Sequence, residues 1–173
     1  MDFQFHVPAD QLTLLTLTNV APNVQTHSVE ALGPDVWRVR LVTPGATPLL
    51  GTQSVAHLEF RAASGLSAFV PLVLSNLVAV QTNGAPIPKT LASHGRVTVV
   101  GAAPLLEAYV GTNGQRSLRL YGPPEATFTL EQTTALEAPW QPAYTNLSIT
   151  NLLRVLPGLP QTAPSIYYRV RQE

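Results

Sequence analysis

Four histidines are the residues of this sequence best suited to metal binding or acid–base catalysis. They are His6, His27, His57 and His94, and they lie in four separate segments. Histidine ligands often stand about two to five residues from the next ligand, and none of the four does so. His6 and His57 also alternate with Phe5 and Phe60, so they fall on the opposite strand face. The sequence therefore predicts surface histidines, no metal site and no cofactor.

Carboxylates and nucleophiles give no stronger indication of catalysis. Asp10, Glu59, Glu107 and Glu131 occupy ordinary strand-like or turn-like segments, and no local pattern pairs them for acid and base work. The chain has no cysteine, no G-x-S-x-G elbow and no glycine-rich phosphate loop. We therefore predict that the protein is not an enzyme and nominate no catalytic residue.

Aromatic and basic side chains offer the alternative of binding. Trp37 shares its strand face with Val39 and Leu41, which predicts a core position, and Tyr168 alternates with Ile166 and Val170 in the same way. The same alternation turns Tyr167, Arg169 and Arg171 outward. This row is the candidate contact surface, although a solvated strand face is the simpler interpretation. Sugar binding would require at least two rings exposed on one surface.

The composition limits the classes of partner. Ten basic residues balance ten acidic ones in 173 residues, and charged residues make up only 12%. With no net charge and no basic cluster, we expect no binding to nucleic acid. No apolar stretch approaches the roughly 20 residues that span a bilayer, so we expect no membrane insertion.

The apolar residues recur at strand spacing. In "VWRVRLV", Trp37, Val39 and Leu41 alternate with Arg38 and Arg40. Similar alternation marks "DFQFHV", "AHLEFRA" and "SLRLYG", and 16 prolines and 11 glycines cut the chain into short segments. The sequence predicts an all-β protein of two β-sandwich domains. At "TNLLRVL", one or two helical turns remain open.

Glycine and proline predict the breaks between these strands. Asn83-Gly84 and Asn113-Gly114 stand between strand-like runs and predict two-residue hairpin turns. Pro71 lacks an N–H group, so its segment suits a sheet edge or a bulge. Residues Gly101 to Pro104 form a short hinge in this interpretation. It separates a domain of residues 1–100 from a smaller domain of residues 101–173.

The order of features in residues 1–100 resembles the cohesin-like family of jelly-roll β-sandwiches from secreted bacterial proteins. The matching residues are Pro8, Asp10 and Leu12, then Ala56, Leu58 and Phe60, followed by the Asn83-Gly84 hairpin and a closing strand in "HGRVTVVG". The family's opening strand has no counterpart here. Either this strand lies upstream of Met1, or the sandwich exposes an unpaired strand edge. In the second case we expect a dimer or a strand donated by another chain.

Residues 105–173 resemble C-terminal immunoglobulin-like or fibronectin-like modules of exported planctomycete and verrucomicrobial proteins. The matching residues are Gly122, Phe128, Leu130, Glu131, Leu136 and Trp140, with Tyr168, Arg169 and Val170 near the end. The resemblance implies that Trp140 packs across the second sandwich. It also implies an extracellular or cell-surface location, with the signal peptide upstream of this chain.

Together the two resemblances imply a non-catalytic pair of modules that serves spacing, anchoring or protein–protein contact. A carbohydrate-binding module that holds a cell-surface polysaccharide is the first alternative. Recognition of a dockerin-like partner by the first domain is the second.

Overall fold

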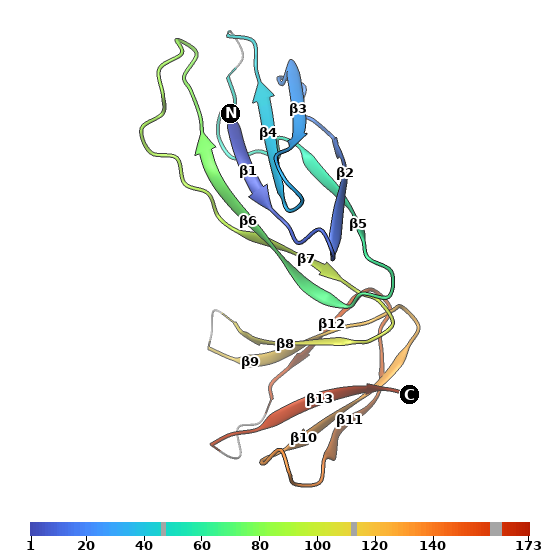
Figure 1. Ribbon diagram of the computed structural model, residues 1–173. Helices are drawn as coiled ribbons and strands as arrows, with labels where there is room; N and C mark the ends of the chain where they lie inside the picture. Colours follow the sequence, from blue (N-terminus) through green and yellow to red (C-terminus); the bar gives the residue numbers. More distant parts are fainter. Residues whose placement is uncertain (46–47, 112–113, 160–163) are drawn as a thin grey trace. The chain divides into compact units, whose positions relative to one another are not determined.

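The computed structural model describes residues 1–45, 48–111, 114–159 and 164–173. In these ranges the only regular secondary structure is β-strand, arranged in antiparallel sheets (Figure 1). The prediction of an all-β protein is confirmed. The segment "TNLLRVL", where a helical turn remained open, instead contributes strand β12 (Leu153–Pro157). No described residue belongs to a helix long and apolar enough to span a membrane.

The chain divides into two compact units. Unit 1 comprises Met1–Ala63 and Phe69–Thr98, whereas unit 2 comprises Ser64–Ala68 and Val99–Glu173. The division between Thr98 and Val99 lies close to the boundary expected from the sequence. The short segment Ser64–Ala68 is an excursion of the first half of the chain into the second unit.

Unit 1 is built from a large and a small sheet. The large sheet has five strands in the order β3-β4-β1-β6-β7, and the small sheet pairs β2 with β5. The strands are β1 (Asp2–His6), β2 (Leu12–Thr18), β3 (Thr26–Ala31), β4 (Val36–Val42), β5 (His57–Ala62), β6 (Ala68–Val78) and β7 (Gly95–Val99). The N-terminal strand β1 lies inside the large sheet, because Phe5 stands opposite both Trp37 of β4 and Leu74 of β6.

The alternation read from "VWRVRLV" accounts for the two faces of β4. Val39 and Leu41 are 0% and 1% exposed in the core, while Trp37 is half-buried on the same face. On the other face, Arg38 Nη2 lies 2.5 Å from Asp2 Oδ2, and Arg40 Nε lies 3.0 Å from the same oxygen. These bonds, chiefly the one from Arg38, hold the pKa of the Asp2 carboxyl below its usual value.

Pro71 was expected to mark a sheet edge or a bulge, and the edge alternative is wrong. Its strand, β6, lies between β1 and β7. Pro71 is tolerated on the β1 side because pairing with β1 begins only at Val73. The strand does contain a register shift, but it lies at Asn76, which has a positive φ of 50°.

Asn83-Gly84 forms a hairpin corner, as the sequence predicts, but the loop has three residues instead of two. The Gly84 N–H donates to the Gln81 carbonyl at 2.9 Å, and the Gln81 N–H donates to the Ala85 carbonyl at 2.8 Å. Asn83 Oδ1 accepts a further bond from the Ala85 N–H at 3.0 Å. Gly84 has a φ of +83°, as expected for a tight turn followed by a glycine bulge. Of the second pair, Asn113 lies outside the described residues.

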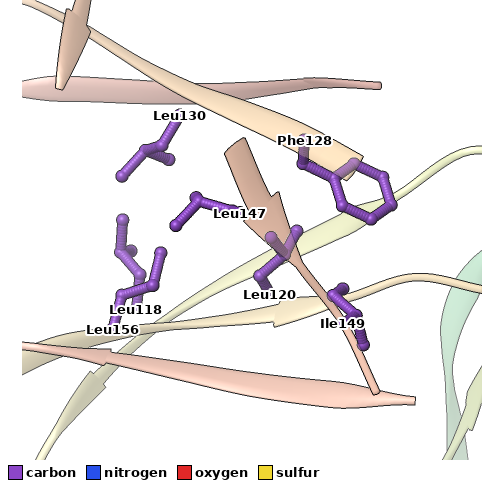
Figure 2. Packing of buried hydrophobic residues seen from close by; sticks show 7 residues of the cluster. All are labelled: Leu118, Leu120, Phe128, Leu130, Leu147, Ile149 and Leu156. Carbon is purple, nitrogen blue, oxygen red and sulfur yellow. The ribbon is translucent and has the colours of Figure 1, made fainter. Parts of the chain in front are cut away.

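Unit 2 has two three-stranded sheets, in the orders β12-β9-β8 and β11-β10-β13. Besides β12, its strands are β8 (Leu105–Val110), β9 (Arg116–Tyr121), β10 (Thr127–Thr133), β11 (Gln141–Ser148) and β13 (Tyr167–Gln172). Figure 2 shows Phe128 and Leu130 of β10 pointing toward Leu118 and Leu120 of β9. One core cluster therefore contains side chains of both sheets, as in sheet-on-sheet packing.

Two glycines of unit 2 are positions of close packing. A Cβ atom at Gly101 would lie 2.3 Å from the Leu66 carbonyl oxygen, and the Gly101 N–H donates to Ser67 Oγ at 3.0 Å. The expected hinge therefore begins with a residue held against Leu66 and Ser67. A Cβ atom at Gly122 would lie 2.5 Å from the Phe128 ring.

Candidate functional site

The outward face of β13 and β10 carries the residues that the sequence nominates for binding. In the β10–β13 pair, Tyr167 stands opposite Thr133, Arg169 opposite Glu131 and Arg171 opposite Thr129. Residues directly opposite in an antiparallel pair share a face, so register brings both strands' polar residues together. We call Glu131, Trp140, Tyr167, Arg169 and Arg171 the β10–β13 surface.

Arg169 lies at the centre of this surface. Its Nε donates to Glu131 Oε2 at 2.6 Å, and its guanidinium carbon lies 4.4 Å from the Trp140 ring centroid. The Arg169 side chain is 53% exposed and that of Glu131 only 12% exposed. The ion pair and the ring contact together orient the guanidinium while its outer part stays accessible to a partner.

The rest of the surface is uneven in exposure. Tyr167 is 41% exposed and Arg171 is also exposed, whereas Thr133 and Thr129, which stand opposite them on β10, are buried. Thr129 Oγ1 donates to a carboxylate oxygen of Glu173, and Thr133 Oγ1 donates to the Ala135 carbonyl at 2.8 Å. The two threonines are thus satisfied internally, and the aromatic and guanidinium groups remain as the groups available for contact.

Trp140 is the residue that sequence reasoning misplaced. It was expected to pack across the second sandwich, but it is half-buried and is not part of the core cluster. It precedes β11, and its ring contacts Arg169 of β13. Nothing in the local spacing reveals this contact, because it depends on how the segment before β11 passes over a strand near the end of the chain. Tyr168 does pack against the core, as predicted.

A cavity of about 400 Å³ in unit 2 is a second candidate site. Tyr109, Arg116, Ser117 and Tyr168 contribute to its lining. Tyr109 is 38% exposed, and the Arg119 guanidinium carbon lies 3.9 Å from its ring centroid. Burial, with a smaller contribution from Tyr144, raises the pKa of Tyr168 above the ordinary tyrosine value, which is already well above neutral pH. Its hydroxyl is therefore protonated at neutral pH and able to donate a hydrogen bond.

The histidines show no arrangement for metal binding. All four are exposed; His57 Nδ1 lies 3.0 Å from Asn19 Nδ2, and His94 Nδ1 accepts the Leu74 N–H at 3.1 Å. Among the described residues, no group of three or more histidine, aspartate or glutamate side chains could hold a metal ion.

Comparison with protein families and with curated protein sequences adds no relative. No protein-family model matches the chain, and no curated protein matches its sequence. The resemblances to cohesin-like and immunoglobulin-like modules therefore stay predictions, and the fold and the two candidate sites carry the functional argument.

Proposed function

We propose that this chain is a non-catalytic binding module of an exported bacterial protein, and that it contacts a protein partner through the β10–β13 surface. The observation that carries the proposal is the oriented Trp140–Arg169–Glu131 group beside the exposed Tyr167 and Arg171. Tryptophan, tyrosine and arginine are the residues most enriched in binding hot spots. The extracellular or cell-surface location rests on the resemblance to exported modules.

The chemistry of the surface specifies the partner. Arg169 uses Nε for Glu131, and its terminal nitrogens point to no second described acceptor. The Arg171 side chain likewise makes no hydrogen bond or ion pair within the described ranges. A partner with carboxylates spaced to meet the two guanidinium groups, and an apolar side chain against Tyr167, would fit. A module that anchors or spaces parts of a larger assembly requires a protein contact of this kind and does not require catalysis.

Site-specific cross-linking tests this proposal. A photoreactive residue at position 167 should capture one exported protein of the source organism, and the substitution Arg169→Ala should remove that product. The matched control carries the same residue at position 91, because Leu91 is 94% exposed in unit 1. Equal capture from both positions, or turnover of a hydrolase substrate that one polar substitution abolishes, would contradict the proposal.

Carbohydrate binding is a second candidate, supported by the cavity that Tyr109 and Tyr168 help to line. Aromatic rings beside hydroxyl and guanidinium groups suit the apolar faces and hydroxyls of a sugar. Titration with a polysaccharide ligand should change the nuclear magnetic resonance signals of the Tyr109 ring. The substitution Tyr109→Ala should abolish binding. Unchanged signals of Tyr109 and Tyr168 across soluble polysaccharides would rule this candidate out.

A further inference from the structure

The two layers of unit 1 differ in width. The large sheet has five strands and the small sheet has two. Phe60 of β5 meets Phe5 of β1 edge to face, with ring centroids 6.0 Å apart, so β5 lies against β1. In the large sheet, β6 and β7 follow β1. Adjacent strands are about 4.8 Å apart, so among the described residues no strand faces β6 and β7 over a width of about two strands.

Burial shows which side of unit 1 is uncovered. Val39 and Leu41 of β4 are 0% and 1% exposed, and Leu12 of β2 is 2% exposed, so these strands cover one another. On the other side, Val70 at the start of β6 is 0% exposed, but the inward residues farther along β6 and those of β5 and β7 are only half-buried. These residues are Leu58 and Phe60 of β5, Leu72 and Leu74 of β6, and Val97 of β7.

The backbone of β5 is unpaired along the same side. In the part of the chain that the structure describes, β5 pairs only with β2, and the Ala63 N–H at its end donates to the Gln11 carbonyl at 2.9 Å. Because N–H groups alternate in direction along a strand, those of Ala62 and Phe60 point away from β2. Such a row of unpaired groups is a template for strand addition.

The width of the gap also selects the kind of partner. A second folded copy pairing through its own β5 would place its large sheet where β6 and β7 already lie. A β-hairpin of a partner protein is two strands wide, like the uncovered region, and it carries no second sheet that would collide with β6 and β7. We propose that the β5 edge of unit 1 binds such a hairpin, with apolar residues at alternate positions covering Leu72, Leu74 and Val97.

The outward residues of β5 add a preference in charge. His57, Glu59 and Arg61 are all exposed on the face opposite Phe60. A donated strand with a basic residue across from Glu59 and an acidic residue across from Arg61 would gain complementary pairs. The strand edge is separate from the β10–β13 surface, so either proposal stands if the other fails.

Amide hydrogen exchange on the full chain tests the proposal with a synthetic hairpin peptide, KVTVENGKVTVE. At peptide excess, exchange at Phe60 and Ala62 should slow by about tenfold or more, while exchange at Val29 on the β3 edge stays unchanged. A control peptide with every valine replaced by serine should give no protection. Absence of protection with the valine peptide would overturn the proposal.

Three variants locate the binding edge. Ala62→Pro removes an N–H that points to the open side and should abolish protection, whereas Ala31→Pro on the β3 edge should leave it intact. Leu72→Thr keeps the backbone but removes an inward apolar contact, and it should weaken peptide binding about tenfold even if Ala62→Pro does not fold. A concentration-dependent dimer that protects β5 without peptide would identify a second copy as the occupant and overturn the hairpin proposal.

Discussion

At the scale of single residues, Gly122 shows how tightly the core of unit 2 is filled. A Cβ atom there would lie 2.5 Å from Phe128 Cζ and 3.2 Å from Ile149 Cδ1. Phe128 is fully buried, so its ring has little room to move away. The space that glycine leaves is thus occupied by the largest side chain of the cluster.

Substitution of Gly122 by alanine should lower the free energy of unfolding by about 1–3 kcal/mol, the usual cost of overpacking a core. Urea denaturation followed by circular dichroism measures this change. The double variant Gly122→Ala with Phe128→Leu should lose less than the sum of the two single variants, because the smaller side chain relieves the contact. Simple additivity would contradict the packing explanation.

The Asp2 carboxylate predicts a dependence of stability on pH. Its pKa is lowered in the folded state, chiefly by the hydrogen bond from Arg38. The resulting stabilisation is complete above the unfolded-state pKa and is lost as the pH falls through the lower folded-state value. At pH 7, Asp2→Asn should therefore unfold at a lower urea concentration than the unmodified chain.

The difference between the two proteins should shrink once the pH falls below the ordinary aspartate pKa of 3.8. Urea titrations from pH 7 to pH 2 supply the measurement. Asp10→Asn is the matched control, because Asp10 is exposed and has no ion-pair partner among the described residues. An equal effect of both substitutions would show that the Arg38 contact is not responsible.

At the scale of elements, the hairpin corner at Gln81–Ala85 depends on one glycine. Gly84 has a φ of +83°, which alanine adopts at a cost of about 1–2 kcal/mol. In a chain carrying Trp140→Phe, Gly84→Ala should therefore shift the denaturation midpoint of unit 1 downward, as reported by the fluorescence of Trp37. Gly33→Ala should have little effect, since Gly33 has open space and no positive φ. Equal shifts would refute the turn geometry.

Sequence alternation predicts single strands well and their neighbours poorly. Val39 and Leu41 lie in the core and Arg38 outside it because a residue's face depends only on its place in the strand. The inner position of β6 and the contact of Trp140 with Arg169 depend on pairing between distant segments. For the same reason, the outward direction of Arg169 was predictable, but its bond to Glu131 was not.

At the scale of the whole molecule, the segment Ser64–Ala68 ties unit 2 to an early part of the chain. Ser67 accepts the Gly101 N–H, and Gly101 fits closely against Leu66. Residues 101–173 expressed alone lack these contacts. They should unfold at a lower urea concentration than unit 2 does within the full chain carrying Trp37→Phe.

Trp140 is then the only tryptophan in both proteins, so its fluorescence reports on unit 2 in each. The substitution Ser67→Ala in the full Trp37→Phe chain supplies an intermediate case that removes one hydrogen bond. Identical midpoints for the fragment and the full chain would show that Ser64–Ala68 contributes nothing to unit 2.

The path of the chain also affects which parts of the gene can be exchanged by recombination. The chain passes between the units after Ala63, after Ala68 and after Thr98, so neither unit is one continuous stretch. A single recombination event that cuts the gene once would carry away one unit together with an incomplete part of the other. The two units should therefore be exchanged between genes as a pair.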